Sequence, residues 1–188
     1  KAAACTAANP DSSKAVAGGG TVSSEQSLTI TAAMCSAPGG CTDLVGFGFR
    51  VATGHDCLEP IPAQRFDPDA LDGTVLALSA KQAHFLPRPE LFDNSYFRIS
   101  PAETAAMDPH QRLLLQVGYA ALHDSAYDRA ALANARVGVM VGSDKPAEWL
   151  SIPQARHAGA YTGTGAAFAI MSNRVSYVLA LQGPSVSV

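Results

Sequence analysis

The chain has little of what marks several large classes of protein. Only 15% of its 188 residues are charged, and 13 Lys and Arg stand against 16 Asp and Glu, for a net charge of -3. Because no basic stripe is available to neutralise phosphates, we do not expect nucleic acid as a partner. The longest periodic apolar segment, 166–181, contains Asn173 and Arg174 and falls short of the roughly 20 apolar residues that span a bilayer. We therefore expect no transmembrane segment.

Cysteine and histidine are also scarce, and they are not spaced as ligands. Offsets of 30, 6 and 16 residues separate Cys5, Cys35, Cys41 and Cys57, which fits neither a CxxC zinc site nor a small disulfide framework. The five histidines show no i, i+4 pair suited to a metal. We expect free intracellular thiols, no metal and no cofactor. None of the cysteines lies between an apolar strand and a helix start, so none is predicted to be a nucleophile.

The composition predicts two parts. Residues 1–27 are rich in Ala, Gly and Ser and lack apolar periodicity, so we expect a flexible tail. Residues 28–188 have the composition of an ordinary globular region, in a chain that is 47% hydrophobic. The Ala and Ser content of the tail and the missing initiator Met fit a processed transit peptide. We therefore expect an intracellular protein, located in a plastid if that interpretation holds and otherwise in the cytoplasm.

The first third of the globular region predicts little regular structure. Residues 28–35 suit a short strand, closed by a loop at Pro38, Gly39 and Gly40. A helix is expected over 42–53, although glycines within it lower helix propensity. Prolines from Pro60 onward force an extended, irregular path.

The next segment predicts two helix starts. Ser100, Pro101 and Glu103 supply a capping hydroxyl, a proline at the first helical position and a carboxylate able to reach back to the cap. The same pattern recurs at Asp108, with Gln111 as the second capping residue. We therefore expect a short helix and then a longer one ending near Ser125, with Leu114, Val117, Ala121 and Leu122 on its apolar face.

The last part of the chain predicts an α/β layer. Residues 137–142 form a continuous apolar run typical of a parallel strand buried on both faces. A single helix is expected over 165–181, entered through closely packed glycines at 163 and 165, with Met107, Phe168 and Met171 in the core. Residues 185–188 alternate like a strand that is too short to pair unless the polypeptide continues or another chain supplies neighbours.

Several of these segments together resemble a known family. In order and spacing, 97–101 (Phe-Arg-Ile-Ser-Pro), 107–115 (Met-Asp-Pro-His-Gln-Arg-Leu-Leu-Leu), 173–179 (Asn-Arg-Val-Ser-Tyr-Val-Leu) and 182–188 (Gln-Gly-Pro-Ser-Val-Ser-Val) look like the N-terminal part of a β-ketoacyl synthase of the polyketide or fatty-acid synthase type. Weaker similarities lie at 35–40, 61–67 and 90–93. Segments 118–123 and 160–165 most resemble single-domain polyketide synthases of dinoflagellate algae.

The resemblance implies an α/β fold: the N-terminal half of a thiolase-like fold, with a mixed sheet and packed helices, incomplete as a domain. It also implies decarboxylative Claisen condensation of acyl and malonyl thioesters, in which a cysteine thiolate accepts the acyl group and two histidines assist decarboxylation. In the family, that cysteine follows a strand resembling 183–188, and both histidines lie further on. We therefore expect the catalytic cysteine and histidines to lie outside this chain, which alone is predicted inactive.

By the same resemblance, 143–145 and 161–167 correspond to parts of the acyl channel and the dimer surface. Candidate substrate-binding residues are Ser143, Tyr161, Thr162 and Ala167. The chain departs from the family pattern at Ser36, Ala37 and Phe66, where the family commonly has Arg, Phe and Trp, and Asp144 and Lys145 are unusual for an acyl channel.

Two hypotheses remain open. The chain is the N-terminal part of a ketosynthase, with an acyl carrier protein as partner, in a homodimer or larger complex. Alternatively, it is a non-catalytic, ketosynthase-derived subunit that stabilises a larger assembly, such as a plastid membrane complex. A small-molecule binding module is a third and lesser interpretation.

Overall fold

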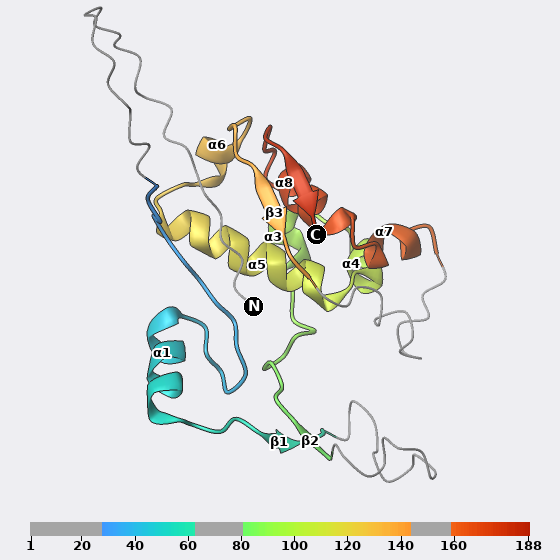
Figure 1. The fold of residues 1–188 in the computed structure, drawn as a ribbon. Coiled ribbons are helices and arrows are strands. Elements are labelled where there is room, and N and C mark those ends of the chain that lie inside the picture. Colours follow the sequence, from blue (N-terminus) through green and yellow to red (C-terminus); the bar gives the residue numbers. More distant parts are fainter. Residues whose placement is uncertain (1–27, 63–80, 144–158) are drawn as a thin grey trace, which may run out of the picture. The chain divides into compact units, whose positions relative to one another are not determined.

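The computed structural model describes residues 28–62, 81–143 and 159–188 (Figure 1). These residues divide into two compact units. Unit 1 comprises the described residues of Met34–Leu91, and unit 2 comprises the described residues of Phe92–Val188 together with residues 28–33. The tail predicted over 1–27 lies outside the described residues, as do Phe66, Asp144 and Lys145.

Unit 1 begins with a tight turn followed by a helix. Ala37 and Cys41 form an isolated antiparallel bridge, and Gly39 and Gly40 between them both have a φ of 77°, a conformation that L side chains rarely adopt. Helix α1 spans Leu44–Thr53, which confirms the helix predicted here. It starts where the Asp43 carboxylate accepts a hydrogen bond from the Gly46 N–H (2.7 Å).

Helix α1 ends at a glycine, and the rest of unit 1 is mostly extended. Gly54 adopts the left-handed conformation at the end of α1. Strand β1 (Glu59–Pro60) then pairs antiparallel with β2 (Gln82–Ala83). A proline in a two-residue edge strand is consistent with the irregular path predicted from Pro60 onward.

The strand predicted over 28–35 is wrong. The stretch has no regular structure, and the side chains of Leu28 and Ile30 within it are 88% and 83% exposed. The residue types favour a strand, but a strand needs a neighbour, and no described strand pairs with this one.

Unit 2 opens with three helices whose starts are set by local capping. Helix α3 spans Asn94–Phe97, α4 spans Pro101–Ala106 and α5 spans Pro109–Asp124. The Ser100 hydroxyl accepts from the Glu103 N–H (3.1 Å), and the Asp108 carboxylate accepts from the His110 N–H (2.7 Å). Both predicted starts are therefore confirmed.

The buried face of α5 differs in part from the predicted one. Ala121 and Leu122 are buried and Leu114 packs against the core, as expected. Val117 is only half-buried, and Leu115, which was not predicted, is the most buried apolar residue of the helix at 1% exposed. Gln111 and Arg112 are also buried. Because the N-cap of α5 is Asp108, the buried Gln111 side chain must contact another part of the chain.

Two short strands form a parallel pair that α8 covers. Strand β3 (Val139–Val141) follows helix α6 (Arg129–Leu132), and β4 (Ser185–Ser187) pairs with it in the register Met140↔Val186. The partner of the final strand is thus β3 of the same chain, which corrects the expectation that it lacked a pairing partner here. Met140 is 71% exposed, so the expectation that β3 is buried on both faces is also wrong for the described residues.

The single helix predicted over 165–181 is two helices. Helix α7 spans Thr162–Ala166 and α8 spans Ile170–Val178. The chain turns at Ala167, which has an extended conformation. Helix α8 packs against β3, β4 and α5 (Figure 1).

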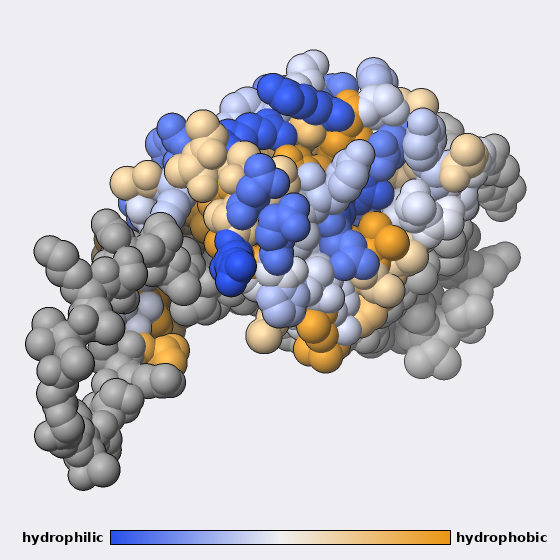
Figure 2. All heavy atoms as spheres, turned by 90° about the horizontal axis from the view of Figure 1, so that it is seen from above, coloured by the Kyte–Doolittle hydropathy of each residue, from blue (hydrophilic) through white to orange (hydrophobic). Residues whose placement is uncertain are grey.

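One apolar core holds unit 2 together, and it includes Met107 and Met171 as predicted, with Phe168 packed at its edge. The buried members of the core are Phe97, Ile99, Met107, Leu115, Leu122, Leu132, Val137, Val139, Val141, Met171, Val175, Leu179 and Leu181. On the face drawn in Figure 2, hydrophilic residues predominate and hydrophobic ones are scattered between them, as on most folded surfaces. Within the described ranges, no helix combines the length and the apolar character needed to cross a membrane.

Candidate functional site

The candidate site begins at the carboxyl ends of the paired strands. The Val188 N–H donates to the Val141 carbonyl (2.8 Å), and the Ser143 N–H donates to the Val188 carbonyl (3.0 Å). These bonds extend the ladder beyond β3 and β4 and hold half-buried Ser143 beside Val188. In open α/β sheets, ligands bind at the carboxyl ends of the strands, and Ser143 lies two residues beyond the end of β3.

The amino ends of the same strands approach too closely for any side chain at position 183. A Cβ built on Gly183 would lie 2.2 Å from the Val137 carbonyl oxygen and 2.6 Å from the Gly138 nitrogen. Only glycine allows this contact. Gly183 therefore fixes how β4 enters the sheet, and with it the position of the chain up to Val188.

Four serines join α8 to β4 across an otherwise apolar interface. The Ser187 hydroxyl donates to the Ser172 hydroxyl (2.9 Å), and the Ser176 hydroxyl donates to that of Ser185 (3.4 Å). Four residues of helix rise about 6.0 Å and two residues of strand about 6.6 Å, so the two pairs match in spacing. Ser172 is fully buried. The seam sets the register of α8 on β4, and sequence analysis missed it, although the i, i+4 and i, i+2 spacing of the serines was the available signal.

Helix α7 carries the other three candidate residues. Tyr161 is the N-cap residue of α7 and is 41% exposed. The Thr162 hydroxyl accepts from the Gly159 N–H (3.0 Å), and Ala167 ends the helix. The structure thus brings Tyr161, Thr162 and Ala167 together on α7 and places Ser143 separately, at the end of β3.

Buried polar contacts hold α7 against α4 and α5. A Cβ on Gly165 would lie 2.1 Å from the Ala106 carbonyl oxygen, whereas a Cβ on Gly163 would meet nothing within 4 Å. The predicted close packing is therefore confirmed for Gly165 and wrong for Gly163. The Gly165 carbonyl accepts from the Asp108 N–H (2.9 Å). The Gln111 side-chain amide donates to the Thr164 carbonyl (3.2 Å) and reaches the Ala167 carbonyl at 3.5 Å. Gln111 is therefore a bridge to α7 and not a cap, which corrects the sequence interpretation.

An ion pair between α8 and α4 completes this framework. Arg174 is 7% exposed, and its guanidinium lies 2.5 Å from the Glu103 carboxylate and 3.5 Å from the Thr164 carbonyl. The Glu103 carboxylate thus pairs with a residue 71 positions away and does not reach back to the Ser100 cap. The Arg174 Nε and Gln111 Oε1 atoms are buried without a hydrogen-bond partner in the described structure. Most buried polar groups in native structures have a hydrogen-bond partner, so these two atoms are exceptions.

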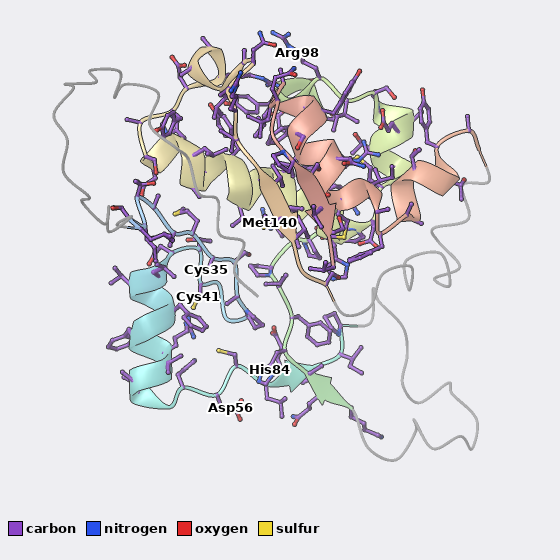
Figure 3. The ribbon with its side chains drawn as sticks, turned by 45° about the horizontal axis from the view of Figure 1, so that its top comes forward. Cys35, Cys41, Asp56, His84, Arg98 and Met140 are labelled. Carbon is purple, nitrogen blue, oxygen red and sulfur yellow. The ribbon has the colours of Figure 1, made fainter. Side chains whose placement is uncertain are left out.

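The cysteines of the described chain belong to unit 1 and are free thiols. Cys35 and Cys41 lie on the segment before α1 (Figure 3). Burial raises the pKa of the Cys35 thiol, and the nearby Cys41 and Asp43 add to this effect. Among the residues that the structure describes, no three His, Cys, Asp or Glu side chains are grouped as metal ligands.

Comparison with known proteins identifies the family. The family model described as "Beta-ketoacyl synthase, N-terminal domain" matches residues 25–188. The chain belongs to the β-ketoacyl synthase family. This match confirms the resemblance drawn from segments 97–101, 107–115, 173–179 and 182–188.

The β-ketoacyl synthase relatives of this chain are large polyketide synthases. It is 37% identical over 174 residues to pikromycin polyketide synthase component PikAII of Streptomyces venezuelae, a match that covers 87% of this chain and 4% of that protein. It is also 37% identical over 155 residues to polyketide synthase ThaG of Burkholderia thailandensis, a match that covers 78% of this chain and 3% of that protein. The chain thus spans a small fraction of these relatives. The narrower resemblance to dinoflagellate synthases stays a prediction.

Solved ketosynthase structures share the fold. The ketosynthase from module 6 of the bacillaene synthase of Bacillus subtilis 168 is 28% identical, with a TM-score of 0.65 over 81% of this chain and 24% of that chain. The oxazolomycin ketosynthase domain OzmH KS7 of Streptomyces albus JA3453 is 32% identical, with a TM-score of 0.65 over 81% and 27%. The predicted fold class is confirmed: this chain forms part of a thiolase-like α/β fold.

Proposed function

We propose that this chain is the N-terminal part of a ketosynthase that condenses an acyl thioester with a malonyl thioester, with loss of carbon dioxide. The observation that carries the proposal is the family match over residues 25–188. In this reaction a cysteine thiolate takes the acyl group, and two histidines stabilise the charge that develops as malonyl thioester decarboxylates. The catalytic cysteine and both histidines are supplied from outside this chain.

The chain itself contributes the framework of the acyl site. Ser143 lies at the carboxyl end of β3, and Tyr161, Thr162 and Ala167 lie on α7. We assign these four residues to the lining of the acyl channel. Gly183, the serine seam and the Arg174–Glu103 pair position the strand and helices that carry them.

The proposal extends to organisation and partners. Residues 28–188 form the ketosynthase region and residues 1–27 a tail. An acyl carrier protein delivers the thioesters, and the synthase works as a homodimer or in a larger complex. Polyketide synthases among the relatives support this assignment.

The test is condensation by the product of the complete gene that includes this sequence. Purified protein is incubated with acyl- and malonyl-carrier protein, and the β-ketoacyl product and the acylated peptide are identified by mass spectrometry. We expect product, with the acyl group on a cysteine outside residues 1–188. Absence of both product and acyl-cysteine would contradict the proposal and favour the non-catalytic subunit as the function.

The acyl-channel assignment has its own matched pair of variants. Ala167→Trp narrows the channel and should lower kcat/KM for long acyl thioesters at least tenfold more than for acetyl thioester. Ala169, at the start of α8, is exposed, so Ala169→Trp should leave this ratio unchanged. Equal effects of the two variants on the ratio would remove Ala167 from the channel.

A further inference from the structure

A concave pocket of about 320 Å³ lies within unit 1, in the size range of small-molecule sites. Its apolar wall includes Pro38, Phe47 and Val51, and its polar groups include Arg50 and Cys57. Two imidazoles, those of His55 and His84, complete the polar part. None of the described residues that line the pocket is acidic. The lining therefore combines an apolar surface, a thiol and groups of positive or neutral charge.

A glycine turn leaves the space that two of these side chains occupy. A Cβ on Gly39 would lie 2.5 Å from the Cys57 sulfur and 2.8 Å from Nη1 of Arg50. Gly39 also has a positive φ, so both its conformation and its lack of a side chain are needed. The turn between Ala37 and Cys41 thus forms a cradle into which Arg50 and Cys57 fit.

Arg50 and Cys57 contact one another directly. Nη1 of Arg50 donates a hydrogen bond to the Cys57 sulfur at 3.6 Å, and both residues are half-buried. Within the described residues, the Arg50 guanidinium makes no ion pair with a carboxylate. Its charge is therefore available to an anionic ligand that enters the pocket.

The other thiols of unit 1 are less suited to reaction. Cys41 lines the same pocket but is only 4% exposed. Burial and the neighbouring Cys41 and Asp43 raise the pKa of Cys35, which keeps that thiol protonated, and the thiolate is the form that attacks. Cys57 differs from both because it combines partial exposure, a pocket and a guanidinium.

We propose that this pocket is a thiol-modification site, in which Cys57 exchanges with small anionic disulfides of the glutathione disulfide type. The Cys57 thiolate attacks one sulfur of the disulfide and forms a mixed disulfide. The original S–S bond breaks, and the second sulfur leaves as a thiolate that takes up the proton Cys57 had released. The protein thiol is oxidised as the small disulfide is reduced, so no other oxidant is needed. Arg50 binds a carboxylate of the incoming molecule.

The test compares two small disulfides of opposite charge on the 188-residue chain carrying Cys5→Ser, because Cys5 lies outside the described residues. Glutathione disulfide is anionic and cystamine is cationic. The rate of reaction of the folded chain with each disulfide is divided by the rate of the urea-unfolded chain with the same disulfide, which removes the difference in intrinsic reactivity between the two disulfides. Adducts are located by peptide mass spectrometry. We expect one principal adduct, on Cys57, that Cys57→Ser abolishes. The normalised rate should be about two- to fivefold higher for glutathione disulfide, the range of a partly exposed charge pair.

Variants of Arg50 test the role of its charge. Arg50→Met should abolish the preference for the anionic disulfide, and Arg50→Lys should retain most of it. Arg88 belongs to unit 1 but does not line the pocket, so Arg88→Met serves as the matched control and should change nothing. On the unsubstituted chain, 1 M salt should remove the preference as well, because screening shortens the reach of charge to about 3 Å. This measurement needs no variant to fold.

Two results would overturn the proposal. One is modification of Cys35 or Cys41 at a rate equal to that of Cys57 in the folded chain. The other is a preference for glutathione disulfide that survives both Arg50→Met and high salt. Neither result bears on the condensing activity, because the reaction uses no thioester and no residue assigned to the acyl site.

Discussion

The two units use similar residue types and bury them very differently. Among its described residues, unit 2 has a core of 13 buried apolar side chains. In unit 1, Cys41 is the only described apolar residue that is buried. Helix α1 of unit 1 contains Leu44, Val45, Phe47, Phe49 and Val51 and buries none of its residues. Apolar character alone therefore does not make a core; elements from distant parts of the chain must meet.

The contacts that hold each unit explain the difference. In unit 2 the Gln111–Thr164 and Arg174–Glu103 contacts join residues 53 and 71 positions apart. In unit 1 the bonds at Asp43 and Cys57 join residues 3 and 7 positions apart, and the His84–Asp56 contact is exposed. We therefore expect substitutions in unit 2 to disturb the whole unit, and those in unit 1 to act locally. Hydrogen exchange at single amides can separate the two outcomes.

Gly183→Ala should have the largest effect. The added methyl group would overlap backbone atoms of Val137 and Gly138, which cannot rotate away as a side chain would. We expect unit 2 to lose about 3 kcal/mol or more, measured as faster exchange of the Val139 N–H, which donates to the Pro184 carbonyl (2.8 Å).

The matched control for that substitution is another glycine of unit 2. A Cβ on Gly163 meets nothing within 4 Å, and the residue lies inside α7. Gly163→Ala should change stability by less than about 1 kcal/mol, in the stabilising direction. Equal losses for the two alanine variants would show that the close approach at Gly183 does not hold β4 in place.

Glu103→Gln should have the next largest effect. It leaves the Arg174 guanidinium, 7% exposed, without a charged partner. Breaking a fully buried pair costs about 3–5 kcal/mol, and because the Glu103 side chain is 26% exposed we expect roughly 2–3 kcal/mol. Faster hydrogen exchange of the Val139 N–H should report this loss of stability.

A double-mutant cycle separates the ion pair from packing effects. Arg174→Met keeps an unbranched apolar side chain at the site and removes the charge. Glu103→Gln combined with Arg174→Met should be more stable than Glu103→Gln alone, because no unpaired charge remains. Additive losses would mean that the two side chains do not interact.

The features that sequence analysis predicted correctly are those encoded within a few residues. The starts of α4 and α5 depend on Ser100 and Asp108, whose side chains bond to backbone within three positions. The limits of α1 depend on Asp43 and Gly54 in the same way. The apolar run at 137–142 likewise predicted strand β3.

The features that were missed depend on distant contacts. The break at Ala167 coincides with a Gln111 side chain that arrives from α5 and reaches carbonyls on both sides of Ala166. The Glu103 carboxylate was expected at its own cap but pairs with Arg174. The predicted strand over 28–35 has no described strand to pair with. Strand β4 does have a partner, which is β3. The candidate site residues came from the family resemblance. Tyr161, Thr162 and Ala167 lie together because they are close in sequence, whereas the position of Ser143 beside Val188 follows from strand pairing.

Two equivalent caps provide a direct comparison of the units. Asp108 is 6% exposed and accepts from the His110 N–H at 2.7 Å. Asp43 is exposed and accepts from the Gly46 N–H at the same distance. Asp108→Ala should cost about 2 kcal/mol and Asp43→Ala about 1 kcal/mol. Asp108→Ala should speed hydrogen exchange of the Val139 N–H. Asp43→Ala should speed exchange only within α1, at the Phe47 N–H.

That difference in location is the sharper result. If Asp43→Ala also exposed the Val139 N–H to exchange, the units would unfold together and the comparison between them would fail. Asp43→Asn retains a capping oxygen, so it should restore most of the protection of the Phe47 amide without altering unit 2.

The smallest expected effect is the acid response of Asp56 in unit 1. The Leu58 N–H donates to its carboxylate at 2.9 Å and His84 lies 3.4 Å from the same oxygen, and these contacts lower the pKa of Asp56 below its ordinary value of 3.8. Because the folded-state pKa is the lower one, ionised Asp56 stabilises unit 1 above the unfolded pKa, and this stabilisation is lost as pH falls through the folded-state value. Carboxyl-carbon NMR should give a midpoint below 3.8. In His84→Gln the midpoint should rise only part of the way, because the backbone bond to Leu58 is the larger cause. Since the Asp56 side chain is 76% exposed, amide exchange in unit 2 should not change as Asp56 titrates. If amide exchange in unit 2 did change, an exposed local contact in unit 1 would be coupled to the core of unit 2, and the division between the two units would be wrong.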